Sequence, residues 1–232
     1  LLPYVTAAQF LPDLMLRGTK KMTYEQLQDR LDELLAKVDI SSPGNGVISV
    51  SIETKRKYLD ELLPLVGEIL REPRFDAEEL EVLRRQAITA TTSQTKEPQA
   101  LAAVAVSRAL APYDKNNIRY VPTLEERIER YKGVTIEQVR NMHGELLNGK
   151  FGEITAVGDF DAPALEKAFE TILSGWSSTI SQERVAQPAI TNIAGKVEQI
   201  ETPDKANAVY YAGEQIAMRD DHPDYPALLI GN

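Results

Sequence analysis

The chain has 232 residues, of which 43% are hydrophobic and 26% are charged, a balance that allows a buried core in one or two domains. Its formal net charge of −9 argues against binding to nucleic acid or to an anionic membrane surface. The absence of cysteine excludes disulfides, thiolate nucleophiles and cysteine-ligated zinc. No apolar run approaches the ~20 residues of a membrane span.

The first periodic stretch is apolar and ends at a glycine. Residues 4–17 predict a helix, and Gly18 is its natural stop because glycine is common directly after a helix C-terminus. Pro12 lies inside this stretch, where it removes a main-chain donor and clashes with the preceding turn. We therefore expect the helix to kink or restart at Pro12.

A helix and a hairpin are predicted next. Thr23 and Gln26 have the spacing of a capping box, which predicts the start of a helix. Residues 38–52 then alternate apolar and polar side chains on either side of a turn at 41–46 that contains Pro, Gly and Asn. This pattern predicts an antiparallel hairpin with one buried and one exposed face.

Further helices are predicted from apolar periodicity and capping signals. They cover residues 57–71, 76–95 and 98–110, and three more begin at Thr123, Thr135 and Asp161. The segment 98–110 is apolar almost all round, which predicts a buried helix. Short strands are predicted at 152–158, 197–200 and 206–213.

The domain organisation follows from a change of composition near the C-terminus. Residues 177–195 are rich in Ser, Thr, Gln, Asn and Pro, which predicts a linker between a domain at 1–176 and the segment 196–232. That last segment is too short for a core of its own, so we expect it to be the start of a following domain. Helices grouped between separate strands predict an α+β fold.

Seven short stretches of the chain form an ordered set of motifs. They are residues 14–19 ending in Gly-Thr, 70–75, 119–123, 156–161, 175–176, 202–206 and 223–228. In this order and spacing they resemble peptidase family M16, the zinc metallopeptidases that include pitrilysin, insulin-degrading enzyme and mitochondrial processing peptidase. The resemblance implies a two-layer α+β domain of the processing-peptidase type, an antiparallel sheet with helices packed on one face. It also implies a clamshell of a catalytic half and a partner half.

The resemblance implies where a zinc motif would lie. The family's catalytic half carries His-x-x-Glu-His just before Gly-Thr, so that two imidazoles one helical turn apart hold Zn²⁺ and the Glu activates its bound water. Counting back from Gly18 places Gln9 and Asp13 at the histidine positions and Pro12 at the glutamate. A later-helix carboxylate is expected near 88–90, where Ile, Thr and Ala stand. We therefore predict no metal, cofactor-binding or catalytic residue in this chain.

Other polar residues receive structural interpretations. His143, next to an inward-facing Met142, is interpreted as lying on the flank of a helix, and His222 as part of a turn or cap. Arg119 and Tyr120 do not occupy a family motif position and receive no role in an active site.

The predicted function is that of a non-catalytic domain from the partner half of an M16-type zinc metallopeptidase. It would form part of the peptide-degradation chamber and support a catalytic half, fused or separate, that holds the zinc. The chain alone is predicted to be inactive, and the parent protein or complex to be a zinc metalloendopeptidase. The hairpin at 38–54 either contacts unfolded peptide by strand addition or is a covered edge.

Two alternatives stay open. The first is a structural or assembly subunit of an M16-like complex without proteolysis. The second is an independent enzyme that uses other residues, which is less favoured because no catalytic constellation is found. The compartment is not determined, and a bacterial periplasm or envelope location is compatible with the resemblance.

Overall fold

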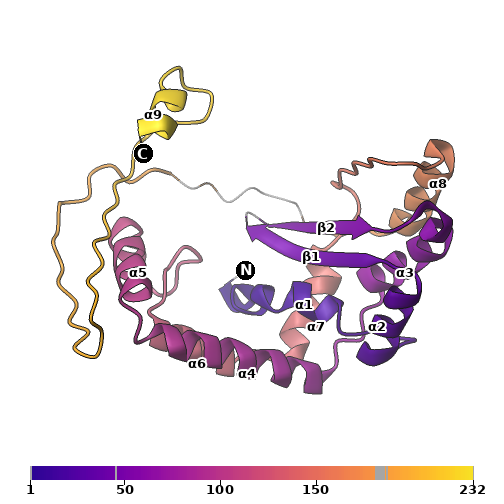
Figure 1. Cartoon of the computed structure of the whole chain (residues 1–232), viewed down its shortest axis with the longest axis horizontal. Coiled ribbons are helices and arrows are strands. Elements are labelled where there is room, and N and C mark those ends of the chain that lie inside the picture. The colour runs from indigo at the N-terminus through magenta and orange to yellow at the C-terminus, as the bar shows by residue number, and fades with distance from the viewer. Residues whose placement is uncertain (1, 45, 181–185, 187, 232) are drawn as a thin grey trace. The chain divides into compact units, whose positions relative to one another are not determined.

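A computed structural model describes residues 2–44, 46–180, 186 and 188–231 (Figure 1). The chain divides into a first unit of residues 1–87 and 130–185 and a second unit of residues 88–129 and 186–232. Asn45 of the predicted turn, and residues 181–185 and 187 of the predicted linker, lie outside the described residues. The domain boundaries at 176 and 195 therefore stay a prediction.

Helices account for most of the regular structure. In the first unit they are η1 (Leu2–Tyr4), η2 (Ala7–Gln9), α1 (Leu11–Met15), α2 (Tyr24–Glu33), η3 (Arg56–Tyr58), α3 (Leu59–Arg71), α7 (Ile136–Leu146) and α8 (Ala162–Leu173). The second unit contains α5 (Pro98–Leu110) and α9 (Tyr225–Gly231). Two further helices, α4 (Ala77–Gln94) and α6 (Leu124–Lys132), include residues of both units.

Local capping signals set where several helices begin. The side chains of Thr23 and Thr135 each accept a hydrogen bond from the main-chain N–H three residues later. The Gln side chain at that position accepts in turn from the main-chain N–H of the Thr. Thr123 and Glu126 form the same reciprocal pair at the start of α6. Asp161 accepts from the N–H of Ala164 at 2.8 Å. The predicted helix starts at these four positions are confirmed.

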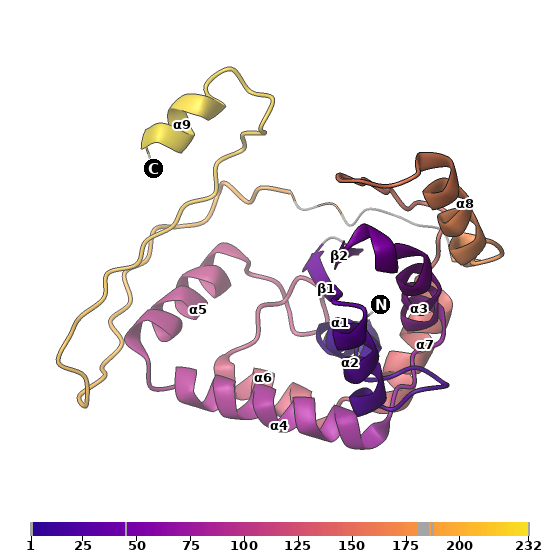
Figure 2. The same cartoon turned by 45° about the vertical axis from the view of Figure 1, so that its right-hand side comes forward.

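The predicted hairpin is also present. Strand β1 (Lys37–Gly44) pairs antiparallel with β2 (Val47–Glu53), with Val38 opposite Ile52 and Ile40 opposite Val50. Val38 and Ile40 are buried, whereas their neighbours in sequence are exposed. The helices α1 and α2 both contact β1 (Figures 1 and 2).

The other predicted strands are absent. Residues 152–158, 197–200 and 206–213 form neither a strand nor a bridge in the structure. A strand exists only where a neighbouring strand completes its ladder of hydrogen bonds. The described chain places no such neighbour beside these three segments. The fold is thus an α+β arrangement with a two-stranded antiparallel sheet.

The core of the first unit includes buried side chains of α1, α3 and the hairpin. Leu14 and Met15 on α1 and Leu62, Val66 and Ile69 on α3 are fully buried. The helix α3 also packs closely on α8, where a Cβ added at Gly67 would lie 3.2 Å from Ile172.

The second unit is less densely packed. The prediction that residues 98–110 form a buried helix is half right, because α5 is a helix but none of its residues is buried. The segment around Gly213 lies along one side of α5, and Gln215 donates to the carbonyl of Leu110 at 2.5 Å. The described chain thus covers only part of the apolar surface of α5. Among the described helices, none has the length and apolar character needed to cross a membrane.

Candidate functional site

The three positions of the expected zinc motif do not lie on one continuous helix. Gln9 ends η2, and α1 starts at Leu11 with Pro12 in its first turn. Proline is well tolerated there, because the first helical N–H groups have no intrahelical acceptor. The predicted restart at Pro12 is confirmed. It leaves Gln9 outside the helix that carries Asp13, so the one-turn spacing of two metal ligands is lost.

The side chain of Gln9 has another partner. The hydroxyl of Tyr131 donates to its Oε1 at 3.1 Å, and the Tyr131 ring packs edge-on against Phe10 at 5.5 Å between centroids. Tyr131 is buried, whereas Gln9 itself is exposed. This contact joins residues 122 positions apart, and no pattern in the sequence pointed to it.

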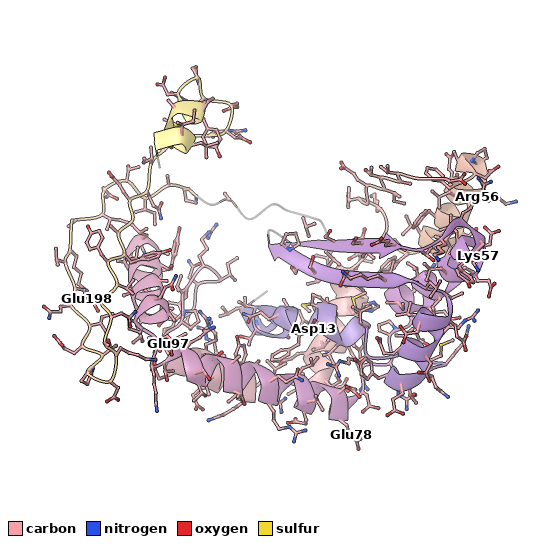
Figure 3. The ribbon with its side chains drawn as sticks, viewed as in Figure 1. Asp13, Arg56, Lys57, Glu78, Glu97 and Glu198 are labelled. Carbon is pink, nitrogen blue, oxygen red and sulfur yellow. The ribbon has the colours of Figure 1, made fainter. Side chains whose placement is uncertain are left out.

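Pro12 and Asp13 differ in exposure. Pro12 is buried with the apolar face of α1, while Asp13 is exposed (Figure 3). A single exposed carboxylate beside a hydrogen-bonded amide does not meet the three-ligand requirement of a catalytic zinc site. In the described part of the chain, no group of three or more His, Asp or Glu side chains gathers in a way that could hold a metal. Residues 88–90 lie in α4 and carry no carboxylate.

The Gly-Thr pair after α1 forms a tight junction. Gly18 has φ +105°, and a Cβ there would lie 2.7 Å from the carbonyl oxygen of Met22. Thr19 is fully buried, and its hydroxyl accepts from the N–H groups of Lys21 and Met22 at 3.2 Å. Thr19 also forms an antiparallel bridge with Pro73. The Gly-Thr motif therefore has a structural role that needs no metal.

An ion pair holds the end of this helix. Arg17 Nη1 lies 3.0 Å from Glu79 Oε2, and the Arg17 guanidinium stacks over the ring of Tyr24 at 4.4 Å. Both partners of the ion pair are largely shielded, with side-chain exposures of 19% and 25%. The two partners lie 62 positions apart, and no pattern in the sequence pointed to their pairing.

His143 is buried, not on a helix flank as expected. Its Nε2 donates to the carbonyl of Leu70 at 2.7 Å, and its ring packs against Phe75 and Trp176. Burial lowers the pKa of this imidazole, and the charge of Lys20 acts in the same direction, although the hydrogen bond to Leu70 opposes them. A neutral imidazole used in this way is a packing residue. His222 lies in a turn, as predicted, where its Nδ1 accepts from the N–H of Asp224 at 3.1 Å.

A polar network organises the segment around Arg119 and Tyr120. The Tyr120 hydroxyl donates to Glu126 at 2.6 Å and accepts from Arg108 at 3.1 Å. Hydrogen bonds from Lys115, Tyr120 and the N–H of Thr123 lower the pKa of Glu126 to about 2. Arg119 bonds the carbonyl of Ala186. The network holds a loop in place, so the structure adds no catalytic role for this pair.

Comparison with known proteins rests on structure. No family model matches the sequence, and no curated protein matches it. Among solved structures, a peptidase M16 inactive domain from Pseudomonas fluorescens is similar with a TM-score of 0.67 and 16% identity, covering 79% of this chain and 44% of that one. A protease from Helicobacter pylori has a TM-score of 0.63 and 14% identity, covering 78% and 43%.

The periplasmic protease PqqL from Escherichia coli is also similar, with a TM-score of 0.59 and 15% identity, covering 82% of this chain and 21% of that one. The chain thus spans less than half the length of each of these structures. The chain therefore has the fold of the M16 peptidase inactive domain.

Proposed function

We propose that the chain is a non-catalytic domain of an M16-type zinc metallopeptidase. One observation carries the proposal: the helix before Gly18 keeps its packing, while the positions for zinc ligands and general base hold Gln9, Pro12 and Asp13. The likeness to an M16 inactive domain supports it. The domain would line a peptide-degradation chamber and support a catalytic half, fused or separate, that carries His-x-x-Glu-His and the zinc.

The hairpin gives this domain a surface for unfolded peptide. Its two strands pair only with each other in the described chain, so each has one unpaired edge. Main-chain hydrogen bonds at such an edge bind a peptide without requiring a particular sequence. We place the peptide-binding contribution of the domain at these edges, between residues 37 and 53.

A zinc titration tests the non-catalytic assignment. We expect the chain to hold no stoichiometric zinc by equilibrium dialysis with metal analysis, and to cleave no unstructured fluorogenic peptide. The triple variant Gln9→His, Pro12→Glu, Asp13→His should also fail to bind zinc tightly, because residues 88–90 supply no third protein ligand. Stoichiometric zinc on the unaltered chain would contradict the assignment.

Reconstitution tests the supporting role. The chain is mixed with a catalytic half that carries His-x-x-Glu-His and comes from the same source, and cleavage of the same peptide is followed. Cleavage that rises with added chain supports the proposed function. A stable complex in which cleavage is absent would favour the structural or assembly subunit instead.

A location in the bacterial periplasm is proposed on the likeness to a periplasmic protease. A chain without cysteine is compatible with that oxidising compartment. Fractionation of cells that express the natural protein checks it, with recovery in the cytoplasmic fraction as the contrary result.

A further inference from the structure

Apolar side chains from two segments of the first unit face an open groove. Leu165, Phe169 and Leu173 follow one another at four-residue spacing on α8, and all three line a groove of about 590 Å³. Ile154 and Ala156 line it from the opposite segment. The helix α8 therefore has two apolar faces, one that packs on α3 through the buried Ile172 and one that faces this groove.

The segment that borders the groove has the pattern of an unpaired strand. Ile154 and Ala156 line the groove and Thr155 does not, which is the alternation of an extended chain. No hydrogen bond joins the main chain of 152–158 to any other described residue. Ile154 and Val157 are 50% and 96% exposed. An extended apolar segment with free main-chain groups is the kind of edge to which another strand adds.

The charge of the groove restricts its occupant further. Glu166 and Glu170 line the groove, and neither forms an ion pair with a described residue. Lys167 lies on the same helix but does not line the groove. A ligand with apolar side chains in alternation and a Lys or Arg near these two carboxylates complements the surface in shape and in charge.

We propose that this groove binds an extended segment of another polypeptide, which adds as a β-strand along residues 153–157. Its alternate apolar side chains fill the space between Ile154 and Phe169, and its basic side chain lies against Glu166 and Glu170. The site is separate from the hairpin edges and does not depend on the proposed peptidase function.

The direct test uses a labelled peptide and the 232-residue chain. The peptide has about eight residues, a common strand length, with Val alternating with Thr or Lys. We expect saturable binding by fluorescence anisotropy, together with slowed hydrogen exchange at residues 153–157 and unchanged exchange at residues 37–53. Absence of binding, or protection at the hairpin in place of 153–157, overturns the proposal.

Methylated peptides test whether the ligand adds as a strand. Successive N–H groups of a strand point to opposite edges, so only one of two alternate sets of amides faces the chain. Methylation of that set should weaken binding at least about tenfold, and methylation of the other set should change it little. Equal effects of the two sets, or equal binding by a peptide of the same composition with its Val residues in one block, contradict strand addition.

Variants of the chain test the groove itself. Phe169→Glu should abolish binding, with circular dichroism confirming the fold. The double variant Glu166→Lys, Glu170→Lys should have a lower affinity for the Lys-containing peptide. It should have a higher affinity for a peptide in which Glu replaces Lys. Lys167→Glu, a change of charge outside the groove, serves as the matched control. An unchanged preference in the double variant overturns the proposal. Hydrogen exchange without peptide gives a further test. If protection of residues 153–157 rises with the concentration of the chain, a second copy occupies the groove, and the proposal is overturned as well.

Discussion

Two helices of equal length show how differently the two units are held. Both α3 and α5 contain 13 residues and are rich in apolar side chains. Five residues of α3 are buried against its neighbours in the first unit, whereas none of α5 is buried. The apolar content of a helix thus indicates that its burial would be favourable. Whether the helix is buried depends on which other elements pack against it.

The two units also differ in what fixes their loops. In the first unit, the junction at Gly18 and Thr19 is buried and pairs with Pro73. In the second unit, a network of charged and polar side chains centred on Glu126 holds the loop before α6. We therefore expect packing changes to affect the first unit most, and changes of charge to affect the second.

The largest expected effect is a matched pair of leucine truncations. Leu62→Ala on α3 removes a fully buried side chain and should lower the free energy of unfolding by about 3 kcal/mol through lost burial and a cavity. Leu101→Ala on α5 removes a half-buried side chain and should cost less than about 1 kcal/mol. Urea denaturation followed by circular dichroism measures both. Equal losses of unfolding free energy would contradict the inferred difference in burial between the two helices.

A second pair concerns glycine in the first unit. Gly18→Ala meets both a positive φ and the Met22 carbonyl, so it should cost about 2–3 kcal/mol. Gly44→Ala has a similar φ of +100° but no atom within 4 Å, and it should cost about 1 kcal/mol. Thermal unfolding midpoints compare them. A Gly18 variant as stable as the Gly44 variant would show that the junction is not tightly packed.

The polar network of the second unit gives a smaller effect. Glu126→Ala removes a capping-box partner and should cost about 1–2 kcal/mol, and Glu126→Gln, which keeps the cap but not the charge, should cost less. The pKa of Glu126 is lowered from 4.5 to about 2, so its contribution is present above pH 4.5 and is lost as the pH falls towards 2. In both variants, the free energy of unfolding measured against pH should lack this component.

The smallest effect comes from His143. Its pKa is lowered in the folded chain because burial disfavours the charged form, so the unfolded chain binds more protons just below the ordinary value of 6.5. The associated stability is present above pH 6.5 and is lost as the pH falls, at a slope below about 1.4 kcal/mol per pH unit. His143→Gln should flatten this slope. A slope that persists in His143→Gln would contradict the assignment.

Signals within a few residues of one another were predicted correctly. The capping boxes at Thr23, Thr123 and Thr135, the helix restart at Pro12 and the presence of a hairpin after Val38 all depend on neighbours in the sequence. Such features form from local geometry and need little from the rest of the chain. The M16 resemblance rested on the order of seven other short stretches, and the structural neighbours agree with it.

Features that need a distant partner were decided by the tertiary structure. The strand expected at 152–158 is absent because no second strand lies beside it, and α5 is not buried because the described chain leaves much of it uncovered. His143 meets Leu70, and Gln9 meets Tyr131, across 73 and 122 positions of sequence. The residue types at positions 9, 12 and 13 predicted a site without zinc ligands. Only the folded chain shows that Gln9 and Asp13 lie in separate helical segments, because burial and long-range pairing depend on which surfaces meet.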